Sequence, residues 1–211
     1  QIKWTDPSVK QALRTMAQVL SDTSNLAGRT SATQTDFTTS VEDVFQDPAK
    51  AAQVIEGDFV PGVVASKTKL RAGTGYGVFP FPSLGADNNV VVGGGDSITV
   101  FKDTPAVRAF VSFLATPQAA DAWAARGGFS SPSKGVSAST YPDDITRTVA
   151  TSLANAKTFR FDMSDLAPAA FGGTPGQGEW KILQDFASNP GNVNGTAAQL
   201  EAAAARAYGQ G

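Results

Sequence analysis

The glycine run at residues 93–96, Gly-Gly-Gly-Asp, has the composition of a ligand-binding loop. A phosphate loop needs its glycines to lead into a helix, whose first N–H groups then face the anion. Here the run leads into residues 97–101, Ser-Ile-Thr-Val-Phe, which alternate like a strand, and no Gly-Lys-Ser/Thr follows. The pattern therefore argues against a nucleotide site and favours a bend, or a close approach of backbone to a ligand.

Two pairs of carboxylates raise the question of acid–base chemistry. Asp162 and Asp165 flank a serine, and a glycosidase needs two carboxyl groups held across a sugar. Asp165 could equally cap the short segment that follows it. Asp143 and Asp144 come directly after a proline at a predicted helix start, where they complement the helix dipole. A carboxylate-dependent enzyme acting on glycans therefore stays open as an alternative.

Two aromatic residues stand in positions where they could contact a ligand. Trp180 follows the glycine-rich loop 172–179 at a predicted helix start, and Phe59 lies in Glu-Gly-Asp-Phe-Val-Pro-Gly. Sugars bind flat aromatic faces through their C–H surfaces, while polar neighbours bind the hydroxyls. Both residues could also be ordinary core aromatics, and position alone leaves the two readings open.

The composition excludes several classes of function. The chain has no His and no Cys, so Ser-His-Asp triads, thiol nucleophiles, disulfides and imidazole or thiolate metal sites are excluded within it. The net charge of −2, with no basic run, gives no electrostatic reason to expect nucleic acid or an anionic membrane as partner. No cofactor motif is present, and we expect no cofactor or metal. No apolar run of transmembrane length and no signal-peptide pattern is visible in the sequence, and we expect a processed or partial chain because it begins with Gln and not Met.

A capping residue followed by proline predicts a helix start, because the cap accepts first-turn N–H groups and proline has none to leave unpaired. This signal occurs at Asp6-Pro7, Asp47-Pro48, Thr104-Pro105 and Thr116-Pro117. Apolar residues spaced by three and four predict further helices around residues 145–156 and 180–187, and a last helix capped by Thr196. Strands are predicted at residues 54–60, 76–82, 89–94 and 97–101. Interleaved helices and strands indicate the α/β class.

Three stretches, taken together and in order, resemble a known family. They are residues 47–62, 91–134 and 178–209, which begin Asp-Pro-Ala-Lys-Ala, Val-Val-Gly-Gly-Gly and Gly-Glu-Trp-Lys-Ile. They resemble the C-terminal portion of extracellular solute-binding proteins of sugar ABC transporters (family 1), with the nearest likeness to the alpha-glucoside and maltose type. The resemblance implies a periplasmic-binding-protein-like type II α/β fold, in which residues 1–92 and 141–211 form the second lobe. Residues 93–140 would cross the hinge and carry helices that pack on a first lobe.

The resemblance also implies a set of ligand-binding residues and no catalytic ones. Carried over position by position, the implied ligand-binding residues are Phe59, Gly94, Gly95, Asp96, Gly128, Phe129 and Trp180. The implied ligand is a sugar, in our reading an alpha-linked oligosaccharide, which the protein delivers to the permease subunits of an importer. The implied location is extracytoplasmic, with a lipid anchor on the full-length protein.

If the first lobe that the resemblance implies is absent, there is a structural consequence for the helices predicted within residues 105–126. Family members carry that lobe ahead of the position numbered 1 here. Without it, we expect these helices to pack on the second lobe in a different manner, or on another copy of the chain. We expect weak or no sugar binding by this chain alone.

Overall fold

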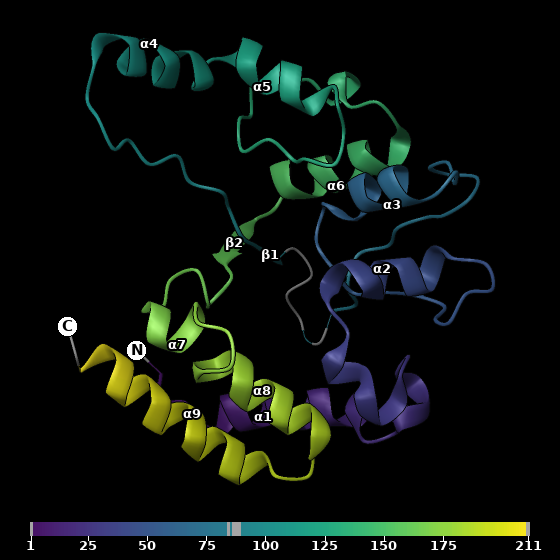
Figure 1. The fold of residues 1–211 in the computed structure, drawn as a ribbon, viewed down its shortest axis with the longest axis vertical. Helices are drawn as coiled ribbons and strands as arrows, with labels where there is room; N and C mark the ends of the chain where they lie inside the picture. Colours follow the sequence, from purple (N-terminus) through teal and green to yellow (C-terminus); the bar gives the residue numbers. More distant parts are fainter. Residues whose placement is uncertain (1, 84, 86–89, 210–211) are drawn as a thin grey trace. The chain divides into compact units, whose positions relative to one another are not determined.

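The computed structural model describes residues 2–83, 85 and 90–209, and these form two compact units. Unit 1 comprises Gln1–Ser40 and Phe161–Gly211, and unit 2 comprises Val41–Arg160. Helices are the main regular structure of both units, and the described residues also form a two-stranded sheet, so the chain mixes helix and sheet as predicted (Figure 1). No helix in the described part of the chain has the length and apolar character that would cross a membrane.

Unit 1 is a helical cluster built around α8. Figure 1 shows α9 running alongside α8 and α1, and these three helices contact one another in pairs. Its α-helices are α1 (Pro7–Leu20), α7 (Ala169–Gly172), α8 (Gly178–Ser188) and α9 (Val193–Tyr208), with 3-10 helices η1 (Thr23–Asn25) and η2 (Arg29–Gln34). Phe186 and Leu200 are each 1 % exposed and lie at the centre of its core.

The ends of the unit 1 helices follow local hydrogen bonding, with one departure from the predicted pattern. Asp6 caps α1 by accepting the Ser8 N–H, and Pro7 occupies the first helical position. The prediction that Thr196 caps the last helix is wrong. Helix α9 begins three residues earlier, and Thr196 is 4 % exposed within it, because this turn packs against the core.

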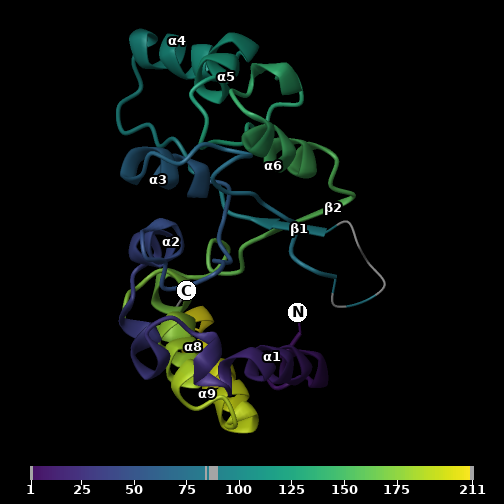
Figure 2. The same cartoon turned by 90° about the vertical axis from the view of Figure 1, so that its right-hand side faces the viewer.

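Unit 2 places a small sheet among short helices. Strands β1 (Val90–Gly93) and β2 (Thr158–Phe161) are hydrogen-bonded neighbours, which Figure 2 shows side by side. The α-helices of unit 2 are the end of α2 (Phe37–Phe45), α3 (Val60–Lys67), α4 (Pro105–Leu114), α5 (Pro117–Ala124) and α6 (Asp144–Ala154), and its 3-10 helix is η3 (Ala138–Thr140). Thr104 and Thr116 cap α4 and α5 as predicted.

Several predicted elements of unit 2 are wrong. Residues 97–101 form no strand, residues 54–60 lead into α3, and residues 76–82 contribute only an isolated bridge at Tyr76. The strand that pairs with β1 is β2, which was not predicted. Asp47-Pro48 starts no helix, because the N–H groups of Lys50 and Ala51 both bond to the Asp43 carbonyl and close a loop instead.

Helix α4 leaves its apolar side chains at the surface. None of its ten residues is buried, and Phe110 and Phe113 are 59 % and 52 % exposed. Phe101, in the irregular segment before α4, is 96 % exposed. The helix therefore has an apolar surface that its contact with α5 does not cover.

Candidate functional site

The structure brings the Phe59 segment and the Gly128–Phe129 loop together within unit 2. Phe59 occupies the N-cap position of α3 and is half-buried. The Asp58 carboxylate accepts a hydrogen bond of 2.9 Å from the Ser130 backbone N–H, which crosses 72 residues of sequence. Phe59 and the 127–130 loop are thus held in one neighbourhood by a polar contact between their immediate neighbours.

A close backbone contact lies in the same neighbourhood. Gly128 has φ +67°, and a Cβ placed on it would lie 3.1 Å from the Gly62 Cα in α3. Phe129, the next residue, stacks on Trp123 of α5 with ring centroids 4.9 Å apart. Glycine is needed at position 128 both for the left-handed backbone and for the close approach.

The segment Gly94–Asp96 follows β1 and is fully at the surface. Gly94, Gly95 and Asp96 are all exposed, and Asp96 makes no hydrogen bond or ion pair with any described residue. Gly93, the last residue of β1, lies against the Phe159 ring of β2, 3.0 Å from where a Cβ would stand. The sheet therefore anchors the start of this segment and leaves the Asp96 carboxylate open to solvent.

Trp180 lies in unit 1, in the first turn of α8, as predicted, and is 41 % exposed. The turn is fixed by the preceding glycine. Gly178 has φ +54°, and a Cβ there would stand 1.9 Å from the Phe171 carbonyl oxygen, so no side chain fits. This contact against α7 fixes where α8 begins, and with it the place of the exposed indole.

The same turn leaves hydrogen-bond donors without acceptors. Gln177, at the N-cap, makes no side-chain hydrogen bond to the helix. The backbone N–H groups of Gly178, Glu179 and Trp180 have no acceptor among the described residues. Unpaired N–H groups beside an aromatic face can donate to ligand oxygens.

Glu179 is a residue of this turn that the sequence did not single out. It is 3 % exposed, and its Oε2 is buried without a hydrogen-bond partner in the described part of the chain. Burial raises the pKa of its carboxyl group, and the nearby negative charge of Asp162 raises it further. A charged residue directly before a helix-start tryptophan was the available signal, but burial of such a residue cannot be read from sequence.

Asp143 and Asp162, two of the carboxylates considered in the sequence, have local structural roles. Asp143 caps α6 by accepting the N–H groups of Ile145 and Thr146, each at 2.9 Å, in agreement with its predicted place at a helix start. Asp162 accepts both the N–H and the hydroxyl of Ser164. Asp165 is exposed and does not cap α7, whose N-cap is Pro168. These contacts do not favour a carboxylate-pair enzyme.

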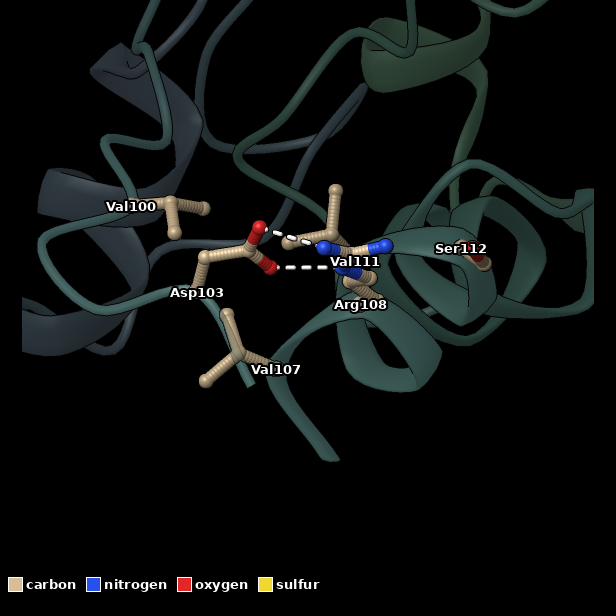
Figure 3. Close-up of a pocket in the computed structure, with 6 residues that line it drawn as sticks. All are labelled: Val100, Asp103, Val107, Arg108, Val111 and Ser112. Atoms are coloured by element: carbon tan, nitrogen blue, oxygen red, sulfur yellow. Dashed lines mark hydrogen bonds and ion pairs between the residues drawn. The ribbon is translucent and has the colours of Figure 1, made fainter. Parts of the chain in front are cut away.

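A further pocket of about 360 Å³ lies at the start of α4, outside the predicted site. Figure 3 shows Asp103 and Arg108 across it, joined by two hydrogen bonds of 2.6 Å, with three valines around them. The Arg108 guanidinium holds the pKa of the Asp103 carboxyl below its usual value. The two side chains are 74 % and 60 % exposed, so the pair is a surface salt bridge and by itself indicates no particular ligand. Within the described residues, no cluster of three metal-ligating side chains is present.

Comparison with known proteins gives two relatives. The chain is 32 % identical over 174 residues to the alpha-glucosides-binding periplasmic protein AglE of Rhizobium meliloti, which covers 82 % of this chain and 38 % of the relative. It is 28 % identical over 173 residues to the osmoprotective compounds-binding protein GgtB of Synechocystis, which covers 81 % of this chain and 40 % of the relative. No family model matches, and neither does any solved structure.

Both relatives are named for the solutes that they bind, which agrees with the resemblance drawn from the sequence. The chain spans about two fifths of the length of these curated relatives. Over four fifths of its own length, the chain belongs with the solute-binding proteins of ABC transporters.

Proposed function

We propose that this chain is part of the substrate-binding component of an ABC importer, and that its ligand is a sugar, in particular an alpha-linked oligosaccharide. The observation that carries the proposal is the 32 % identity to an alpha-glucosides-binding protein across most of the chain. The exposed indole of Trp180 at the start of α8 supports it. The carboxylate-enzyme alternative is not favoured, because both relatives are named as binding proteins.

The proposed recognition combines aromatic faces with polar groups. In unit 1, the half-exposed indole of Trp180 offers a flat face to sugar C–H groups, and the unpaired N–H groups of the same turn donate to hydroxyls. In unit 2, Phe59, the Gly128–Phe129 loop and the open carboxylate of Asp96 supply a second set of the same kinds of group. Both sets consist of groups that suit a neutral, hydroxyl-rich ligand.

We further propose the type II arrangement that the resemblance implies, with ligand bound between two lobes. Residues 1–92 and 141–211 would form the second lobe, and residues 93–140 would cross the hinge. The ligand would favour the closed state, because only that state places both lobes on the sugar. The closed protein would deliver the sugar to membrane permease subunits from an extracytoplasmic location, where a lipid anchor would hold the full-length protein.

We also propose that the exposed apolar surface of α4 associates with a second copy of this chain when nothing else covers it. Phe101, Phe110 and Phe113 are each more than half exposed and lie on or just before this one helix. Exposed apolar surface of this kind is typical of an interface.

A second candidate ligand is an osmoprotective compound, because the second relative is named for binding such compounds. If that compound were a small quaternary ammonium solute, it would bind aromatic faces by cation–π attraction rather than through hydroxyls. Isothermal titration calorimetry of the gene's complete product against maltose, trehalose and glycine betaine separates the two. The proposal expects saturable heat with at least one sugar. Heat with glycine betaine alone would select the second candidate and reject the sugar.

A further inference from the structure

The Glu179 side chain is buried although it ends in an ionisable carboxyl group. Glu179 lies between Gly178 and Trp180 in the first turn of α8, is 3 % exposed, and leaves Oε2 unpartnered among the described residues. Ionised carboxylates inside proteins are normally paired or hydrogen-bonded, because an unpaired buried charge is costly. The burial seen here therefore fits the neutral, protonated acid.

No positive charge among the described residues pairs with Glu179. On α8 itself, Lys181 pairs with Asp185. Helix α7 carries no charged residue, and the charged residues of the other elements packed against α8 are Lys10, Arg14, Arg29, Glu201 and Arg206. None of these forms an ion pair with Glu179 in the described structure, and Glu201 accepts the Trp4 N–H at 2.7 Å. The charge that acts on Glu179 is that of Asp162, which has the same sign.

The turn that contains Glu179 also sets the position of the indole. Gly178 is held against the Phe171 carbonyl, and two residues later Trp180 points a half-exposed ring to the surface. We propose that Glu179, in its neutral form, is a positioning residue that holds the first turn of α8, and with it Trp180, in the observed place. Ionisation of Glu179 draws the carboxylate towards water and loosens this turn.

The direction of the pH effect follows from the raised pKa. Because the folded chain binds this proton more tightly than the unfolded chain, the contribution of Glu179 to stability is full at acidic pH. It declines as the pH rises from the ordinary glutamate pKa of about 4.3 to the raised folded value, and it stays lost above that. The equilibrium constant for unfolding rises by about tenfold for each pKa unit of the difference. Only the effect of this loosening on ligand binding at Trp180 rests on the proposed function.

The test uses the full 211-residue chain with Trp4→Phe and Trp123→Phe, so that Trp180 is its only tryptophan. Acrylamide quenching of Trp180 and the urea midpoint of unfolding are measured from about pH 4 to about pH 9, which spans the glutamate titration. We expect quenching to rise and the midpoint to fall with pH in this protein. Glu179→Gln keeps the shape of the neutral acid, and we expect it to hold the acidic-pH quenching throughout.

Two further variants keep the test decisive if Glu179→Gln does not fold. Asp162→Asn removes the like charge and should move the transition in quenching to lower pH, whereas Asp165→Asn, in the same loop, should leave it in place. A pH profile that is the same with Glu179→Gln or with Asp162→Asn as in the parent would overturn the proposal. No ligand is present in these measurements, so they are independent of whether the chain binds a sugar.

Discussion

The Asp58 carboxylate accepts a hydrogen bond of 2.9 Å from the Ser130 N–H and so ties the residue before Phe59 to the residue after Phe129. Both aromatic residues were predicted ligand contacts, and they lie 70 positions apart in the sequence. The contact is polar and exposed. This hydrogen bond holds a loop whose own sequence is rich in glycine and serine and would not by itself fix the backbone.

Replacing Asp58 tests this contact. We expect Asp58→Ala to lower the free energy of unfolding by about 1 kcal/mol, the usual contribution of one hydrogen bond, and to speed hydrogen exchange at the Ser130 amide. Asp58→Asn retains an oxygen acceptor and should stay closer to the parent. Hydrogen exchange at Ser130 that is unchanged in Asp58→Ala would show that the loop is held by other contacts.

Replacing Gly128 separates backbone strain from crowding. Gly128→Ala should cost about 1–2 kcal/mol for the left-handed backbone, and more for the approach of its Cβ to Gly62. Gly73 is the matched control, since it has φ +77° with nothing within 4 Å of a Cβ. Gly73→Ala should show the backbone cost alone. Equal urea midpoints for the two variants would contradict the close contact between the loop and α3.

Charging the surface of α4 tests self-association. Phe110 and Phe37 are both 59 % exposed, so Phe110→Glu and Phe37→Glu remove equally exposed rings from different helices. Sedimentation velocity should show association of the parent and of Phe37→Glu, and a monomer for Phe110→Glu. A parent chain that stays monomeric at every concentration would refute the proposed second copy.

Local signals in the sequence predicted helix starts well. Asp6, Thr104 and Thr116 all cap helices, because a cap needs only its own side chain and the next three N–H groups. The same signal failed at Asp47-Pro48, where a longer-range bond prevails. The Asp43 carbonyl takes the N–H groups that a new helix would leave unpaired.

Strands were harder to predict because their pairing is not local. Residues 97–101 alternate as a strand should, yet Ile98 is 64 % exposed and the segment has no ladder partner. The partner of β1 is β2, more than 60 residues away and only four residues long. Alternation shows which side chains could share a face, but not which segment pairs with which.

For the candidate site too, local features could be predicted from the sequence, and features that depend on packing between elements could not. Trp180 could be placed at a helix start from its flanking glycines, and the structure confirms that place. The burial of Glu179 could not be predicted, because it depends on how α7 and α8 pack against each other. The roles of Phe59, Gly94, Gly95, Asp96, Gly128, Phe129 and Trp180 in binding stay predictions.

The most direct test of the account is a calorimetric titration of the gene's complete product with maltose and trehalose, for the parent and for Trp180→Ala. The account predicts saturable heat with an alpha-linked sugar and at least a tenfold weaker affinity in Trp180→Ala, which corresponds to about 1.4 kcal/mol. Phe37→Ala, which removes an exposed ring from another helix, should bind like the parent. No heat with any sugar, or an affinity that Trp180→Ala leaves unchanged, would contradict it.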